Sequence, residues 1–101
     1  MDKLNKEEIL SYLKEKKEEF FSEYQLVKLG LFGSYARGEQ TDNSDIDLIV
    51  EFKPNTENLA EIKYEIKSNI KNQFKREVDL CREKYIKPYF KSQILQSVIY
   101  V

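Results

Sequence analysis

The 101-residue sequence contains no histidine, and this absence removes several classes of active site. The Ser-His-Asp triad, the Cys-His pair and the histidine-ligated metal centre all need an imidazole ring. Any catalysis must therefore come from carboxylates, hydroxyls, backbone amides or a metal ion that is held by oxygen ligands.

Cysteine is also scarce, since Cys81 is the only one and cannot form an internal disulfide. A lone cysteine favours a reducing compartment. The chain begins with polar and charged residues, and no apolar run approaches the roughly 18 to 20 residues that a membrane span needs. We therefore expect a cytoplasmic protein that makes no contact with a membrane.

The chain also lacks a strong charge of either sign, because its formal net charge is -1. Nucleic-acid binding normally rests on a basic surface that neutralises several phosphates. We therefore expect nucleic acid to bind at most through a local contact. The length suits one domain that spans residues 1–101, in which thirteen tyrosines and phenylalanines help to supply one core.

Hydrophobic periodicity predicts a small α/β (α+β) domain, a short mixed sheet packed by helices. In the strand that starts at Leu26, alternation places Leu26, Lys28, Gly30 and Phe32 on one side, opposite Val27, Leu29 and Leu31. Pro88 is suited to the first turn of the last helix. The expected order is helix 5–24, strand 26–32, a polar loop, strand 46–52, helix 59–74, strand 77–82 and helix 88–98.

Glycine is informative because there are only three, and Gly30, Gly33 and Gly38 fall within nine positions. A Gly33-Ser34 turn between a strand and a short helix offers backbone amides and a hydroxyl to a phosphate oxygen. Arg37, one helical turn later, can add a guanidinium to the same anion. For an isolated Gly-Ser pair, an ordinary tight turn in which Ser34 is a helix N-cap is the better explanation.

Carboxylates are concentrated at the start of the second strand, where Asp45 and Asp47 follow Ser44. Alternation puts both aspartates on one face with α-carbons ~6.6 Å apart, so their oxygens can share hard divalent cations. The alternative is a turn in which Asp45 caps a backbone amide. Asp79 stands in the third apolar strand and completes a three-carboxylate site if strands two and three are neighbours. By itself, Asp79 is equally well explained as an aspartate at a strand end.

Together these segments resemble the signature of the DNA polymerase beta-like nucleotidyltransferase superfamily. Within it, the short length and nearly the whole chain are similar to the minimal nucleotidyltransferase (MNT) antitoxins that are paired with HEPN-type toxins. The matching segments are GSYARG at 33–38, SDIDL at 44–48 and VDL at 78–80, with further similarity at Ile86-Lys87-Pro88 and over 94–101.

The resemblance implies a nucleotidyltransferase that moves AMP from ATP to a tyrosine hydroxyl of the partner toxin. It implies that Asp45, Asp47 and Asp79 are catalytic residues and hold two Mg²⁺ ions. It further implies that ATP is bound by Gly33, Ser34, Arg37 and Ser44. The toxin would be the product of the adjacent gene.

Two other functions stay open at this point. The chain could neutralise a toxin by binding alone, with the nucleotide site dispensable. It could instead transfer nucleotides to a small molecule or to RNA. Members of the superfamily that do so carry further domains to hold the acceptor, for which about a hundred residues leave no room.

Overall fold

The computed structural model describes residues 3–101, and its elements follow the predicted order, including the short helix expected after the Gly33-Ser34 turn, with two additions. The additions are a short 3₁₀ helix after the third strand and a fourth strand at the end of the described chain. The helices are α1 (Lys6–Glu23), α2 (Gly33–Arg37), α3 (Leu59–Phe74), η1 (Glu83–Tyr85) and α4 (Pro88–Ser97). The strands are β1 (Leu26–Phe32), β2 (Ile46–Phe52), β3 (Val78–Arg82) and β4 (Ile99–Tyr100).

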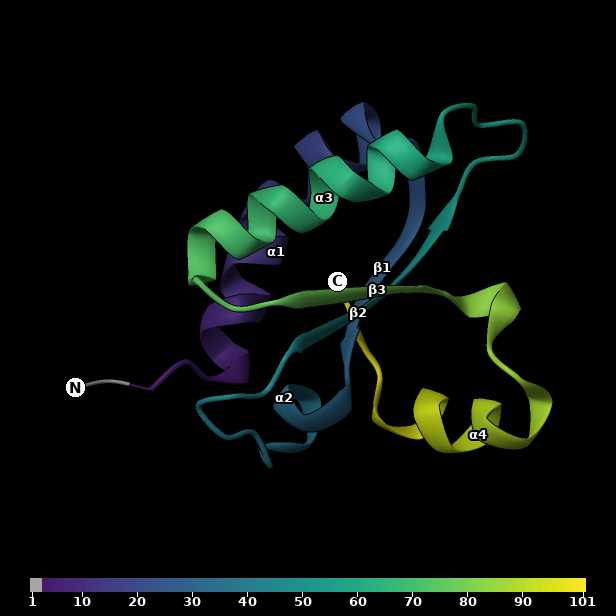
Figure 1. The fold of residues 1–101 in the computed structure, drawn as a ribbon. Helices are drawn as coiled ribbons and strands as arrows, with labels where there is room; N and C mark the ends of the chain where they lie inside the picture. The colour runs from purple at the N-terminus through teal and green to yellow at the C-terminus, as the bar shows by residue number, and fades with distance from the viewer. Residues whose placement is uncertain (1–2) are drawn as a thin grey trace.

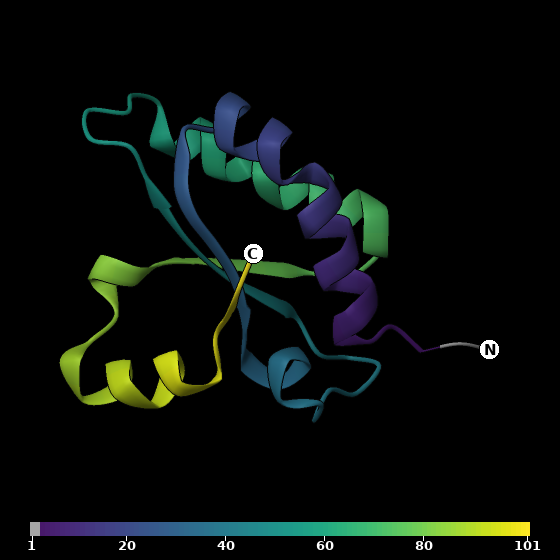
Figure 2. The ribbon, with the colours of Figure 1, turned by 180° about the vertical axis from the view of Figure 1, so that it is seen from behind.

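The strands form one mixed sheet in the order β3-β2-β1-β4. β1 pairs antiparallel with β2 and β4, whereas β2 and β3 are parallel. α1 and α3 cover one side of the sheet, and α2 and α4 lie on the other side (Figures 1 and 2). This arrangement confirms the predicted α/β class.

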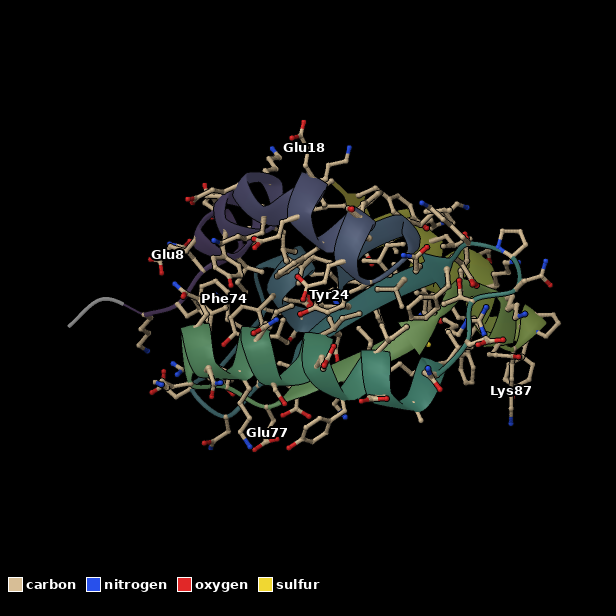
Figure 3. The ribbon with its side chains drawn as sticks, turned by 90° about the horizontal axis from the view of Figure 1, so that it is seen from above. Glu8, Glu18, Tyr24, Phe74, Glu77 and Lys87 are labelled. Atoms are coloured by element: carbon tan, nitrogen blue, oxygen red, sulfur yellow. The ribbon has the colours of Figure 1, made fainter. Side chains whose placement is uncertain are left out.

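The core lies between the sheet and the two long helices. α1 begins where the side chain of Asn5 accepts a hydrogen bond from the backbone N–H of Glu8, at 3.0 Å. Seen from above, α1 and α3 lie side by side, and Tyr24 at the end of α1 points between them (Figure 3). Tyr24 there accepts a hydrogen bond from Asn69 of α3. Each fully buried aliphatic side chain in this layer contributes about 1.5–3 kcal/mol.

The prediction that side chains alternate strictly along β1 is wrong at Leu26, the first residue of the strand. A β-bulge between Leu26 and Lys28 shifts the register, so Leu26 joins Leu29 and Leu31 in the core. A bulge inserts one extra residue into a strand and so moves the following side chains to the opposite face. The remaining strand keeps Gly30 and Phe32 on the face away from α1 and α3.

The end of the described chain was not predicted as a strand. α4 ends at Ser97, and β4 pairs with Gly30 and Leu31 of β1. Gly30 makes this approach feasible, because a Cβ there would lie 2.9 Å from Val98 Cγ1 and 3.0 Å from Tyr100 Cδ1. Over residues 3–101, none of the helices combines the length and the apolar character that crossing a membrane requires.

Candidate active site

Asp47 of β2 and Asp79 of β3 are direct neighbours in the parallel ladder. Residues in register on adjacent strands point to the same face and are about 4.8 Å apart in the pairing direction. The second and third strands are therefore neighbours, which is the condition under which Asp79 was expected to join the other two aspartates. Asp45 is exposed one residue before β2 begins, and its charge acts on Asp47.

The electrostatics of this group centre on Asp47, which is half-buried. Burial, followed by the negative charges of Asp79 and Asp45, raises the pKa of Asp47 from 3.8 to about 6, and Arg37 opposes the shift. Carboxylates that repel one another in this way are stabilised by a cation.

The donor set consists of oxygen atoms, which Mg²⁺ prefers as ligands. Within residues 3–101, no three acidic or cysteine side chains already converge on a common metal position. The residue types fit a magnesium ion, and the paired carboxylates of Asp47 and Asp79 provide the nucleus of such a site.

The glycine turn reaches the same carboxylate from the other side. Phe32 is paired with Asp47 across the sheet, and α2 begins at the next residue, Gly33, with φ of +75°. A Cβ at position 33 would collide with Asp47 Oδ2. Ser34 is the second residue of α2, so the alternative in which it is the N-cap is wrong, because Phe32 occupies that position.

Arg37 and Ser44 are less directly involved. Arg37 is exposed at the end of α2 and pairs with Glu39, with Nε–Oε1 at 2.8 Å. Ser44 Oγ accepts a hydrogen bond from the backbone N–H of Thr41, at 2.9 Å, and so helps to shape the loop before β2. The structure thus brings Arg37 within electrostatic range of Asp47 and gives Ser44 a role in loop geometry.

Two neighbours of the aspartates were missed from the sequence. A hollow of about 650 Å³ lies between α2 and α4, lined by Phe32, Arg37 and polar residues of α4 that include Gln93 and Gln96. The only signal for this hollow was the spacing of the two glutamines, which places them on one helical face.

Cys81 follows Asp79 by two residues, and burial together with the nearby Asp79 raises the pKa of its thiol.

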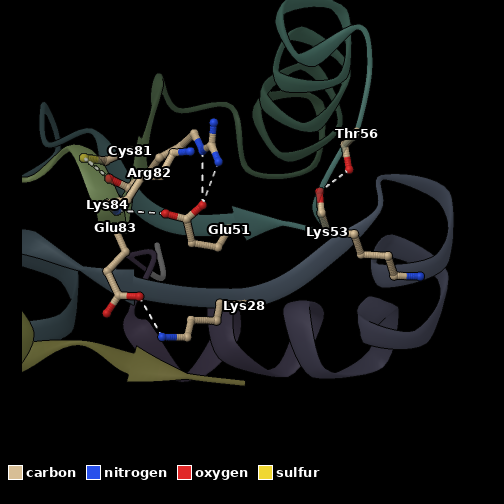
Figure 4. Close-up of polar contacts among 8 residues, drawn as sticks. All are labelled: Lys28, Glu51, Lys53, Thr56, Cys81, Arg82, Glu83 and Lys84. Carbon is tan, nitrogen blue, oxygen red and sulfur yellow. Dashed lines mark hydrogen bonds and ion pairs between the residues drawn. The ribbon is translucent and has the colours of Figure 1, made fainter.

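An ion-pair network holds the opposite end of the sheet (Figure 4). Arg82 donates to Glu51 Oε1 through Nε and Nη2, at 3.2 and 2.9 Å, and the backbone N–H of Lys84 donates to Glu51 Oε2 at 2.8 Å. Lys28 on β1 pairs with Glu83 at 2.7 Å. These contacts attach η1 to β1 and β2, so they set where the chain leaves the sheet toward α4.

Comparison with known proteins places these features in a family. Residues 8–101 match the family model described as a nucleotidyltransferase domain. A candidate protein adenylyltransferase of Methanocaldococcus jannaschii is 39% identical over 95 residues, 93% of this chain and 95% of that protein. The protein adenylyltransferase MntA of Thermococcus cleftensis is 33% identical over the full length of both chains.

Solved structures share the fold. A candidate minimal nucleotidyltransferase superposes with a TM-score of 0.73 at 27% identity, covering 91% of this chain and 92% of the other. A toxin–antitoxin complex with AMP-PNP superposes with a TM-score of 0.65 at 25% identity, covering 86% of this chain and 70% of the other. In each comparison the similarity extends over most of this chain.

Proposed function

This chain belongs to the nucleotidyltransferase domain family as a minimal member, and on that premise we propose that it transfers AMP from ATP to a tyrosine hydroxyl of a HEPN-type toxin. The modification would neutralise the toxin, whose gene we expect to be adjacent. One observation carries the proposal: Asp47 and Asp79 are in register on one face of the sheet, with the glycine turn packed against Asp47.

Two relatives support this choice of donor and acceptor. The Thermococcus cleftensis relative is a protein adenylyltransferase, and the two chains match along their whole lengths. The toxin–antitoxin complex at 25% identity contains AMP-PNP, a nucleotide that carries an adenine and a triphosphate. An adenylyl donor and a protein acceptor therefore agree with this chain's relatives. The free thiol of Cys81 suits the cytoplasmic location that we propose.

The reaction exchanges one bond to phosphorus for another. The tyrosine oxygen attacks the α-phosphorus of ATP, the bond from that phosphorus to the α–β bridging oxygen breaks, and pyrophosphate leaves. Asp79, which is exposed at the edge of the sheet, accepts the proton of the hydroxyl. Two Mg²⁺ ions held by Asp45, Asp47 and Asp79 would, when bound, neutralise charge on the attacking and leaving oxygens.

The remaining site residues orient the triphosphate. In this proposal the backbone at Gly33 and the hydroxyl of Ser34 hold phosphate oxygens beside Asp47, and Arg37 adds positive charge. Ser44 keeps the loop before β2 in place through its bond with Thr41. Such chemistry depends on positioning and on charge neutralisation, and it needs no histidine base.

The test is to incubate the purified protein with the HEPN-type protein of the adjacent gene, ATP and MgCl₂, and to weigh the partner by intact mass spectrometry. We expect the mass of one or more AMP groups to be added, and peptide mapping should place them on tyrosine. Asp45→Asn with Asp47→Asn should abolish the addition. Glu18→Gln, on the exposed face of α1, is the matched control and should leave it unchanged.

Other outcomes would replace the proposal. An unmodified partner that is still neutralised by the double aspartate variant would identify an antitoxin that acts by binding alone. Release of pyrophosphate without any partner protein, in the presence of RNA or a small-molecule acceptor, would indicate a different substrate class.

A further inference from the structure

A groove runs along the outer edge of the sheet between α3 and β3. Two hollows, of about 930 Å³ and about 450 Å³, share Lys71, Asn72 and Glu77 and therefore form one continuous depression, which we call the edge groove. Its floor includes Val78 and Leu80 of β3. One end reaches Asp45, so the groove leads to the candidate active site.

Basic residues dominate the edge groove, although the whole chain has a net charge of -1. Its acidic members are Asp42, Asp45 and Glu77, and Glu77 pairs with Lys71 at 2.7 Å beside the outer side of α3 (Figure 3). Its basic members are Lys63, Lys67, Lys71, Lys75 and Arg76. Lys63, Lys67 and Lys71 are spaced four residues apart on α3, a spacing that places them along one face of the helix, and Lys75 is the C-cap of that helix.

Two of these lysines are available to a ligand. Among residues 3–101, neither Lys63 nor Lys67 takes part in an ion pair. At the end of the groove near Asp45, the buried Nε of Arg76 has no hydrogen-bond partner in the described part of the chain. The charge of the groove is therefore complementary to an acidic ligand.

The backbone of β3 is open on the side of the groove. Within residues 3–101, β3 is an edge strand whose one partner is β2. In Figure 1 it crosses the foreground between α3 and α4, with no other described segment in front of it. An uncovered edge presents N–H and C=O groups that pair with another extended chain. Such a pairing selects a peptide backbone over the phosphates of a nucleic acid.

Alternation along β3 connects the groove to the catalytic face. Val78 and Leu80 face α3 and the groove, whereas Asp79 points to the opposite face, where Asp47 lies. A strand added beside β3 would follow the same alternation. A side chain opposite Asp79 would then be on the catalytic face, and its two neighbours in the added strand would face the lysines.

We propose that the edge groove binds the acceptor segment of the partner protein as an added β-strand, with the acceptor tyrosine opposite Asp79 and acidic residues on either side of it. The inference rests on the proposed function for the identity of the acceptor. It adds a recognition rule: an extended segment in which tyrosine is flanked by aspartate or glutamate.

The experiment uses short synthetic peptides and the full chain. One peptide has a central tyrosine between two glutamates, and its matched control has lysines in place of the glutamates. Binding is measured by fluorescence anisotropy without nucleotide. We expect the glutamate peptide to bind at least tenfold more tightly at low salt and to weaken as salt increases.

Backbone pairing is tested with the peptide and not with the protein, so that folding is unaffected. Two further peptides carry N-methyl groups on alternate backbone amides, so that each peptide is blocked along one edge of the strand it would form. We expect one of them to lose at least tenfold in affinity and the other to bind like the parent peptide. If both peptides kept or both lost the same affinity, the edge pairing would be overturned.

Charge reversal in the protein tests the lysines. Lys63→Glu with Lys67→Glu should weaken the glutamate peptide at least tenfold and strengthen the lysine peptide. Lys14→Glu with Lys53→Glu, at exposed positions outside the groove, is the matched control and should change neither. Unchanged peptide binding by the Lys63→Glu, Lys67→Glu variant would overturn the inference. Single-stranded RNA that displaces the glutamate peptide at a lower concentration than unlabelled peptide does would also overturn it.

A second readout separates this inference from the proposed function. The glutamate peptide is incubated with the protein, ATP and MgCl₂, and the peptide mass is recorded. Binding without added AMP would leave the groove established and count against the transfer reaction. Addition of AMP at equal rates to both peptides would support the transfer reaction and overturn the recognition rule.

Discussion

Gly33 packs so closely against Asp47 that no side chain fits between its backbone and the Asp47 carboxylate. The contact links the glycine turn of α2 to the central aspartate of the candidate site. Gly33 also has a left-handed φ of +75°, a conformation that costs other residues about 1–2 kcal/mol. Position 33 is therefore constrained by both space and backbone conformation.

The first prediction follows from this contact. Gly33→Ala should reduce AMP transfer at least a hundredfold, because the added methyl group displaces the Asp47 carboxylate and misplacing a catalytic group is costly in rate. Gly38→Ala is the matched control: Gly38 has a similar φ of +73° but open space around it. It should lose only the stability that the left-handed backbone costs, about 1–2 kcal/mol, and retain activity, as measured by thermal unfolding and partner mass. Equal activity losses in both variants would contradict the role of the contact.

Asp47→Asn should abolish transfer and stabilise the metal-free protein. The pKa of Asp47 is raised to about 6, so its ionisation opposes folding from about pH 4 upward and reaches its full cost above pH 6. The gain at pH 8 should be about 1 kcal/mol, because the carboxylate is still partly solvated. The gain in stability should vanish near pH 3, where the side chain at position 47 is neutral in both wild type and variant. Urea unfolding in EDTA measures the gain, and a variant less stable than wild type at pH 8 would contradict the prediction.

Glu51→Gln should destabilise the protein by about 2 kcal/mol at pH 7, since it weakens a largely buried pair with Arg82. Burial alone would raise the pKa of Glu51, but hydrogen bonds from the Lys84 backbone and Arg82 outweigh it and lower the pKa below 4.5. The stabilisation is thus complete above pH 4.5 and is lost as the pH falls through the lower folded value. Urea unfolding at pH 7 and at pH 3 measures the free energy of unfolding of both proteins. We expect the wild type to exceed Glu51→Gln by less at pH 3 than at pH 7. A difference independent of pH would exclude the ion pair as its source.

Lys75→Gly should stabilise the protein by about 0.5–1 kcal/mol. Lys75 ends α3 with φ of 57°, and its backbone N–H bonds to the carbonyl of Lys71 at 2.8 Å. Glycine adopts this left-handed conformation without strain. Gln73→Gly, inside the same helix, is the opposite control and should cost about 1 kcal/mol. Thermal unfolding of both variants provides the measurement, and a loss of stability in Lys75→Gly would contradict the expected relief of strain.

Most of the elements could be predicted from local sequence patterns. β2 and α3 occupy their expected positions because their apolar residues recur at the periods of a strand and a helix. The bulge at Leu26 and the strand at Ile99 could not be predicted in this way. Both depend on contacts with distant residues: Leu26 turns inward to fill the core, and Ile99 pairs with β1 only because Gly30 leaves room.

The features of the candidate site can be separated in the same way, into those that local sequence determines and those that depend on distant contacts. The sequence alone determined the chemistry: no histidine, a Gly33-Ser34 turn, and two aspartates two residues apart at the start of an apolar strand. Only the tertiary structure decided that β3 pairs with β2, which brings Asp79 beside Asp47, and that burial with two neighbouring charges raises the pKa of Asp47. Residue type and spacing belong to the chain, whereas strand order and burial exist only after folding has chosen which distant segments share a core.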